Sequence, residues 1–238
     1  MFNDLPGQLY AALVKDDRWL LYLKGLGNTA IIAIGAIIIG MILGTIVALI
    51  KVNAKLNRNN IALKILNAIG DVYLTVIRGT PMMVQILIGF NIIFAGLSFD
   101  YSIFVAVLCF GINSGAYVAE IVRSGIQSVS HGQFEAGRSL GLSNRQTMSM
   151  IILPQAIKNI LPALANEVIV LFKETAIVGY IAVQDLTKMA TLIQSRTYQP
   201  FVPLILAALI YLGIVMLMTW GMRKLERRLG KGDRHHRS

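Results

Sequence analysis

The chain has 238 residues, of which 55% are apolar and only 14% are charged, a balance that a soluble globular domain does not need. Its net charge of +10 is not accompanied by aromatic residues interleaved with Lys and Arg, so a nucleic-acid partner is excluded. The single cysteine, Cys109, leaves no disulfide framework and no metal-ligand spacing. Gly230-Lys231-Gly232 lacks the rest of a phosphate-binding loop. We therefore expect no catalytic residue and no metal site.

The first 24 residues are expected to lie along a membrane surface. They combine several leucines with the aromatic side chains Tyr10, Trp19 and Tyr22, a pattern typical of an interfacial helix with aromatic anchors. The segment also carries acidic residues, and the apolar run that follows it is too long for the core of a cleaved signal peptide.

Five segments are expected to cross the membrane. At about 1.5 Å per residue, each is long enough to span or nearly span a hydrocarbon layer about 30 Å thick. Four of them contain no Asp, Glu, Lys or Arg: Gly25–Ile50, Gly79–Phe99, Tyr101–Ala119 and Thr197–Met222. The fifth, Asn159–Ala182, is interrupted by Glu167, Lys173 and Glu174, so its hydropathy alone is ambiguous.

The basic residues favour five crossings over four. With five, the basic segments 51–64, 123–158 and 223–237 all lie on one side, which the positive-inside rule makes cytoplasmic. With four, the most basic segment would lie outside. The sequence therefore predicts an all-α membrane protein with five transmembrane helices, its N-terminus out and its C-terminus in, forming one domain over residues 1–238.

Small residues and prolines mark where these helices pack and bend. The first crossing has Ala36, Gly40, Gly44 and Ala48 at four-residue intervals, and the third has Gly111, Gly115 and Ala119. Such faces allow close helix–helix approach. An amphipathic helix is expected from about Ile61 through Val76, with a break at Pro81 inside the bilayer. Pro154 and Pro162 flank the start of the fourth crossing, and broken helices of this kind are tolerated where protein or a cavity surrounds them.

Polar residues in the second crossing leave two interpretations open. Arg78 ends its polar stretch, and Gln85 lies about one helical turn beyond Pro81. Arg78 is suited to bind a substrate carboxylate. The favoured alternative is that it pairs with Asp71, seven residues earlier on the same helix face.

The third and fourth crossings also carry polar residues at helical spacing. Asn113, Tyr117 and Glu120 share one face, and Glu167 and Glu174 are seven residues apart. Because a charge at the bilayer centre costs about 2.5–3.5 kcal/mol on insertion scales, such residues face a bundle interior or a wet cavity. One interpretation is a site for a zwitterionic or cationic solute. The other is internal pairing, of Lys173 with Glu174 or Glu167 and of Glu120 with Arg123.

Residues 130–154 form a polar helix-turn-helix between two crossings, on the cytoplasmic side of the predicted topology. Ser130 and Gln133 match a capping box, and Ser143 and Gln146 repeat it. Gly141 suits the left-handed position that ends a helix, and Pro154 is expected to halt or kink the second helix. A membrane protein with so defined a projection is expected to dock a partner there.

Several of these residues resemble a known signature. Glu135-Ala136-Gly137, then Gly141, then Ile151-Ile152-Leu153-Pro154 looks like the EAA signature of permease subunits of bacterial ABC importers, with Gly137 in place of the second alanine. The runs Val76–Gln85, Asn113–Glu120 and Asn166-Glu167 resemble the polar amino-acid branch, that of the histidine, glutamine and arginine permeases. The likeness covers residues 28–229.

The resemblance implies a type I importer permease fold and assigns roles to residues. The helix Gln133–Leu140 would be the coupling helix that docks on an ATPase. Its coupling residues would be Glu135, Ala136, Gly137, Arg138, Ser139, Leu140 and Gly141. The substrate pathway would comprise Glu167, Asn113, Glu174, Arg78, Gln85 and Tyr117.

The resemblance also implies partners and a location. Two cytosolic ATPase subunits would bind ATP and Mg²⁺, so this chain would be no enzyme and would hold no cofactor. A second permease, identical or a sister subunit, would complete the path, and an extracytoplasmic binding protein would deliver a polar amino acid. The chain would be a multi-pass protein of the bacterial plasma (inner) membrane, in contact with lipid.

Three alternatives remain. Glu135 and Arg138, three residues apart, would simply pair on a solvated face, which leaves Gly141 and the two caps without a purpose. A five-helix secondary amino-acid transporter would be half of an inverted repeat, and the asymmetry of basic residues disfavours antiparallel insertion. A channel or scaffold would not need the projection at residues 130–154.

Overall fold

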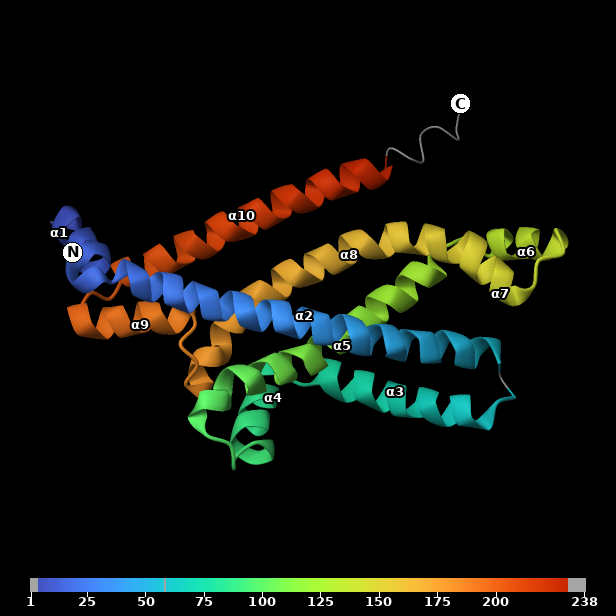
Figure 1. Ribbon diagram of the computed structural model, residues 1–238, viewed down its shortest axis with the longest axis horizontal. Helices are drawn as coiled ribbons and strands as arrows, with labels where there is room; N and C mark the ends of the chain where they lie inside the picture. Colours follow the sequence, from blue (N-terminus) through green and yellow to red (C-terminus); the bar gives the residue numbers. More distant parts are fainter. Residues whose placement is uncertain (1–3, 58, 231–238) are drawn as a thin grey trace. The chain divides into compact units, whose positions relative to one another are not determined.

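The structure is a computed structural model, and it describes residues 4–57 and 59–230. All regular elements in these ranges are helical (Figure 1). The α-helices are α1 (Leu5–Leu9), α2 (Trp19–Leu56), α3 (Ile61–Gly79), α4 (Met82–Ile88), α5 (Ser102–Gln127), α6 (His131–Ser139), α7 (Asn144–Thr147), α8 (Leu153–Glu174), α9 (Leu186–Thr197) and α10 (Val202–Gly230). The other turns are η1 (Tyr10–Val14), η2 (Lys15–Asp17), η3 (Gly89–Ile93), η4 (Phe99–Tyr101), η5 (Met148–Ile152) and η6 (Thr175–Ile181).

The chain falls into two compact units. The first comprises Met1–Ile38, Pro81–Gly111 and Ile169–Met218, and the second comprises Ile39–Thr80, Ile112–Val168 and Thr219–Ser238. The long helices α2, α5, α8 and α10 each contribute residues to both units, so the two are described separately below.

Three described helices are long and apolar enough to cross a membrane: Trp19–Lys55, Phe99–Gln127 and Val202–Arg227. A fourth candidate is the pair Ile61–Gly79 and Met82–Ile93, which is bent by 107° at the break. The expected break at Pro81 is therefore confirmed. Between its two end residues, the expected crossing Gly79–Phe99 is helical only over Met82–Ile93. The helix α8, in which charged residues interrupt the apolar sequence, is not among the candidates.

In the first unit, the helix α2 begins at Trp19, six residues before the expected start of the first crossing. Tyr22 is buried rather than exposed, and its hydroxyl donates to the Pro203 carbonyl at 3.4 Å. It is therefore a packing residue and not an aromatic anchor, whereas Tyr10 and Trp19 are exposed as expected. The core of this unit comprises Ala12, Tyr22, Leu186, Ala190, Ile193, Val202 and Ala207.

In the second unit, α2 packs closely on α5. A Cβ atom added at Gly40 would lie 2.9 Å from Ser114 Oγ, and one at Gly44 would lie 2.6 Å from the Gly115 carbonyl oxygen. The small-residue faces predicted for both helices are thus confirmed as a contact at backbone distance. The helix α3 joins them through Tyr73, whose hydroxyl donates to the Ile112 carbonyl at 2.5 Å. Val47, Leu74, Ala116 and Ala119 form the core here.

The two later prolines do not interrupt the chain as expected. Pro154 is the second residue of α8, and Pro162 lies inside the same helix. The chain passes from α7 into α8 through the π-helical turn Met148–Ile152. Because a proline ring clashes with the carbonyl four residues earlier, here that of Met150, the wider π turn accommodates Pro154 without ending the helix. The prediction that Pro154 halts the second helix was wrong, and its alternative, a kink at Pro154, stays a prediction.

Candidate functional site

The first candidate site is the hairpin of α6 and α7, which lie side by side and are joined by a tight turn (Figure 1). Gly141 has a φ of +83°, in the left-handed region that glycine adopts without penalty. The Leu142 amide donates to the Gly137 carbonyl at 3.2 Å, and the Gly141 amide donates to the Arg138 carbonyl at 3.0 Å. These two bonds make a Schellman motif, so the predicted helix stop at Gly141 is confirmed.

The second helix of the hairpin begins with a complete capping box. Ser143 Oγ accepts from the Gln146 amide at 3.2 Å, and Gln146 Oε1 accepts from the Ser143 amide at 2.9 Å. Both bonds satisfy amides that a helix start leaves unpaired. The turn is therefore fixed on both sides by bonds between residues three to five apart in the sequence.

The first helix begins differently from the prediction. Ser130 is the N-cap of α6, but its side chain makes no capping hydrogen bond. Gln133 Oε1 instead accepts from Gln155 Nε2 at 3.4 Å, so the amide that should reach back to Ser130 is turned toward α8. The capping box at residues 130–133 was a wrong prediction, because a long-range contact takes one of its members. The helix itself runs over His131–Ser139 rather than Gln133–Leu140.

The charged residues of the hairpin do not pair with each other as one alternative required. Glu135 Oε1 lies 3.1 Å from His131 Nδ1, one turn earlier. The Arg138 guanidinium donates to the Leu142 carbonyl beyond the turn. Arg138 thus binds the backbone across the Schellman motif, and a simple Glu135–Arg138 pair is not formed.

Gly137, which replaces an alanine of the EAA signature, lies buried where α6 meets the start of the next helix. An added Cβ would lie 2.7 Å from Thr147 Cγ2 and 2.9 Å from Ile151 Cδ1. Thr147 is fully buried and donates to the Ser143 carbonyl at 3.0 Å, so it has little room to move. The glycine therefore lets the two helices of the hairpin pack more closely than alanine would.

One large apolar side chain of the hairpin, that of Leu140, is mostly exposed. Leu140, the last residue before Gly141, is 80% exposed. Ala136 and Ser139 are exposed beside it on α6. Leu140 is thus available for contact with a partner, on a turn that is fixed at both ends.

The second candidate site is a polar cluster on α3 and α5, within the second unit. The Arg78 guanidinium carbon lies 5.7 Å from the centre of the Tyr117 ring, and Arg78 Nη1 lies 4.0 Å from Glu120 Oε2. Glu120 also pairs with Arg123, as one interpretation expected. The proposed pairing of Arg78 with Asp71 is wrong, because Asp71 pairs with Lys51 on α2. The lysine lies on another helix, which spacing along α3 does not reveal.

Deeper in the same unit, Ser114 links α5 to α8. Its Oγ donates to Glu167 Oε1 at 2.9 Å. Ser114 is fully buried and Asn113 is 3% exposed. The sequence analysis did not select Ser114, although it lies between Asn113 and Gly115 on the small-residue face of α5. Ser114 is thus one hydrogen-bond partner of Glu167, supplied by a different helix.

The remaining predicted pathway residues lie in the first unit. Gln85 is on α4, and Glu174 is the exposed last residue of α8. The second unit contains the other four predicted pathway residues: Arg78, Tyr117, Asn113 and Glu167. Within the described residues, no group of three or more His, Cys, Asp and Glu side chains is placed to hold a metal ion.

Comparison with known proteins assigns a family. The family model described as "Binding-protein-dependent transport system inner membrane component" matches residues 36–231. The putative glutamine transport system permease protein GlnP of Rickettsia bellii (strain RML369-C) is 38% identical over 226 residues, which cover 93% of this chain and 99% of that protein. The arginine transport system permease protein ArtQ of Bacillus subtilis (strain 168) is 38% identical over 212 residues, covering 89% and 93%.

Solved structures agree. A crystal structure of an amino acid ABC transporter with histidines matches with a TM-score of 0.80 and 42% identity, covering 87% of this chain and 94% of that one. The MetNI methionine ABC transporter in an inward-facing conformation matches with a TM-score of 0.72 at 17% identity, covering 91% and 99%, and this second likeness concerns the fold alone.

The family fixes the general role of the chain. Its members are multi-pass proteins of the inner membrane, and a binding-protein-dependent ABC system implies an ATPase and a binding protein as partners. The permease carries no cofactor. The chain therefore belongs to the family of inner-membrane components of binding-protein-dependent transport systems, in which it is a permease subunit and not an ATPase.

Proposed function

We propose that this permease subunit carries a polar amino acid that an extracytoplasmic binding protein delivers. The relatives are named for glutamine and arginine, and the matched crystal structure is named for histidines. These solutes share an α-ammonium, an α-carboxylate and a polar side chain. A path for them needs side chains of both signs, and Arg78 and Glu167 supply one of each.

The proposed topology has five crossings, with the N-terminus out and the C-terminus in, in one permease domain over residues 1–238. Four crossings correspond to α2, the bent pair of α3 and α4, α5 and α10. The fifth is α8, whose charged residues need protein or water around them. The hydrogen bond from Ser114 to Glu167 supports this, because it gives one of those carboxylates a partner inside the second unit. The segment that precedes α2 would lie along the outer surface.

The observation that carries the coupling proposal is the construction of the α6–α7 hairpin. A Schellman motif ends α6 and a capping box begins α7, so the turn resists deformation by its own local bonds. Leu140 is exposed on that turn. An element that transmits motion from a closing ATPase to α5 and α8 needs two properties. It needs a surface that the ATPase binds, and it needs a turn that does not deform.

For the translocation path we propose Arg78, Asn113, Tyr117 and Glu167 of the second unit, with Gln85 and Glu174 of the first. Arg78 is suited to an α-carboxylate, since a guanidinium binds a carboxylate through two parallel hydrogen bonds. Glu167 is suited to an ammonium group, because its carboxylate supplies the negative charge that an ammonium binds, and the Ser114 hydroxyl holds one of its oxygens in place.

The proposed assembly has two ATPase subunits, which bind ATP and Mg²⁺, and a second permease, identical or a sister chain. A permease of this kind supplies the path and the contact surfaces, while the energy comes from ATP hydrolysis in the partner.

The test is uptake by proteoliposomes that contain the chain with its ATPase, second permease and binding protein. We expect uptake that requires internal ATP and the binding protein, and competition among the twenty amino acids is expected to be strongest from those with polar side chains. A complex with a catalytically inactive ATPase is the control. Uptake that continues without ATP, or competition from apolar amino acids alone, would refute the proposal.

A further inference from the structure

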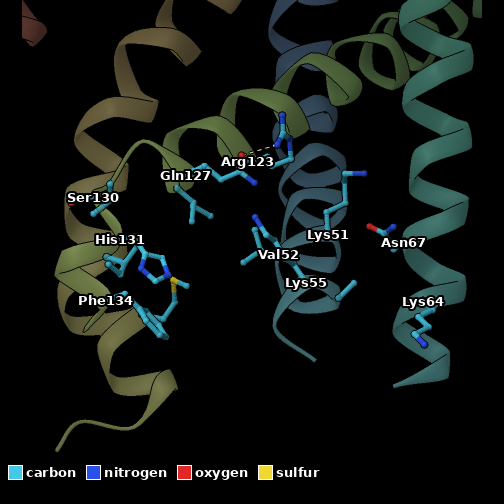
Figure 2. A pocket seen from close by; sticks show the side chains of 15 residues that line it. Lys51, Val52, Lys55, Lys64, Asn67, Arg123, Gln127, Ser130, His131 and Phe134 are labelled. Carbon is cyan, nitrogen blue, oxygen red and sulfur yellow. Dashed lines mark hydrogen bonds between the residues drawn. The ribbon is translucent and has the colours of Figure 1, made fainter. Parts of the chain in front are cut away.

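The second unit contains a pocket of about 1000 Å³ that the proposed transport mechanism does not use. Figure 2 shows side chains of α2 and α3 and side chains of α5 and α6 around one space. Five basic residues line it: Lys51, Lys55, Lys64, Arg123 and His131. None of its described lining residues is acidic.

The positive charge of this pocket is only partly matched. Three of the five basic residues pair with carboxylates that lie outside the lining: Lys51 with Asp71, Arg123 with Glu120, and His131 with Glu135. Lys55 and Lys64 are exposed, and neither forms an ion pair with any residue in 4–57 or 59–230. The pocket is therefore suited to an anion.

Apart from Asn67, Gln127 and Ser130, the rest of the lining is apolar, which is unusual for a site that binds only a small soluble anion. Val52, Ile126, Phe134 and Ile152 are among the residues that line it. The neighbouring helix α3 also leaves apolar side chains exposed on its own surface: Ile61, Ile65, Ile69 and Val72. A ligand that binds both the basic residues and the apolar side chains has an anionic group joined to a hydrocarbon chain.

The position of the pocket along the helices agrees with such a ligand. The uncharged stretch of α2 ends at Ile50 and that of α5 at Ala119, and the lining residues Lys51 and Arg123 follow directly or within one turn. In a membrane, both helices leave the hydrocarbon layer at this level, where phospholipid headgroups lie. Ser130 and His131, at the start of α6, also line the pocket.

We propose that this pocket binds the phosphate headgroup of an anionic phospholipid, with Lys55 and Lys64 as the residues that bind the phosphate. Basic pockets between helices at a membrane surface favour such lipids over zwitterionic ones. A phosphate held there contacts the α2–α3 connection on one side and the start of the α6–α7 hairpin on the other. The bound lipid thereby links the α2–α3 connection to the start of the hairpin, both of which carry positive charge.

The first test compares variants of the full chain purified in neutral detergent. Short-chain phosphatidylglycerol, phosphatidylcholine and free glycerol phosphate are each titrated, and binding is followed by the rise in unfolding temperature. We expect phosphatidylglycerol to bind at least tenfold more tightly than either of the others. Replacing both lysines (K55Q and K64Q) is expected to weaken its binding about twenty- to thirtyfold, since each surface lysine contributes about fivefold.

The matched control removes the same charge elsewhere, at the exposed Lys24 and Lys224, and is expected to bind phosphatidylglycerol like the parent chain. An equal loss in this control would overturn the proposal in favour of general charge attraction. Equal affinity for glycerol phosphate would assign the pocket to a soluble phosphate and overturn the lipid assignment. Unchanged binding by the K55Q/K64Q chain would overturn the site itself.

A second test needs no substitution. The assembled transporter is placed in nanodiscs of phosphatidylglycerol or of phosphatidylcholine, and its lysines are acetylated and quantified by mass spectrometry. Lys55 and Lys64 should be acetylated several-fold more slowly in phosphatidylglycerol, while Lys24 should react equally in both. Protection that depends on adding the ATPase, and not on the lipid, would show that a protein surface covers the pocket and would refute the proposal.

Discussion

The α6–α7 hairpin is held in a different way from the polar cluster of α3 and α5, taken here together with the bond from Ser114 to Glu167 of α8. The hairpin is fixed by bonds between residues three to five apart, such as Leu142 to Gly137 and Ser143 to Gln146. The cluster is fixed by contacts between different helices, such as Ser114 to Glu167 and Arg78 to Glu120. A local element keeps its shape while its surroundings move, and a long-range one changes when the helices shift. The first is suited to transmit a motion, and the second to respond to it.

The largest expected effect comes from separating α2 and α5, on which the cluster depends. Gly44→Val should destabilise the chain by about 3 kcal/mol or more, because the new Cβ meets backbone atoms of Gly115 and Ala119 that cannot rotate away. Thermal unfolding in detergent measures it. Gly27→Val on the same helix is the control, since nothing lies within 4 Å of its added Cβ. Equal loss in both variants would show that close helix approach is not the cause.

The next effect concerns transport rather than stability. Glu167→Gln removes a charge but keeps the hydrogen-bonding shape, so uptake of a cationic amino acid should fall about tenfold or more, as expected for a hydrogen bond between charged groups worth about 1.5–3 kcal/mol. ATPase binding should be unchanged. Both are measured in the same proteoliposomes. If uptake and ATPase binding fall together, Glu167 has a packing role.

The hairpin turn should be sensitive at Gly141. Gly141→Ala places a Cβ at a φ of +83°, which costs about 1–2 kcal/mol. Hydrogen exchange at the Gly141 and Leu142 amides should accelerate, and ATP hydrolysis should continue with reduced uptake. Because the cluster does not depend on this turn, exchange in α5 should stay as in the parent chain. If hydrogen exchange at the turn accelerates while uptake per ATP hydrolysed stays unchanged, the rigidity of the turn is not needed for transport.

The two ends of the hairpin give a smaller, paired prediction. Ser143→Ala removes a capping bond that is present and should cost about 1 kcal/mol. Ser130→Ala removes a side chain that makes no capping bond, so its effect should be within about 0.5 kcal/mol. Thermal unfolding measures the loss of stability in each of the two variants. Equal losses would mean that Ser130 caps its helix after all.

The smallest effect is expected at the Arg78–Glu120 contact. The two groups are 4.0 Å apart and partly exposed, so a double-mutant cycle with Arg78→Gln and Glu120→Gln should give a coupling energy of at most about 1 kcal/mol. The pair Glu120–Arg123 serves as the comparison and should couple more strongly, because a hydrogen bond joins them. A coupling energy above about 2 kcal/mol for Arg78 would contradict this.

The same division explains what could be predicted from the sequence. Gly141 and the Ser143 capping box were predictable because their partners are three to five residues away. The small-residue faces at Gly44 and Gly115 were predictable from their spacing. The partners of Asp71 and Glu167 were not, because Lys51 and Ser114 lie on other helices. The capping box at Ser130 failed for the same reason, since Gln155 of another helix contacts Gln133.

The pathway residues show a further limit. Sequence spacing placed Asn113, Tyr117 and Glu120 on one face, and the structure separates them by depth: Asn113 is buried, and Tyr117 is 39% exposed beside Arg78. Sequence periodicity predicts which residues share a helix face, but it does not predict which neighbouring helices bury that face. The exposure of Leu140 was likewise invisible in the sequence, since a position before a helix stop does not show what packs on its side chain.

The most direct test of the proposed mechanism is crosslinking from the hairpin turn. The single native cysteine, Cys109, is replaced by alanine, and Leu140→Cys is introduced. In the assembled transporter, this cysteine should crosslink to the ATPase subunit and resist a membrane-impermeant maleimide added from outside. A cysteine that the maleimide labels from outside, or that reaches no ATPase while the complex hydrolyses ATP and imports its solute, would contradict the account.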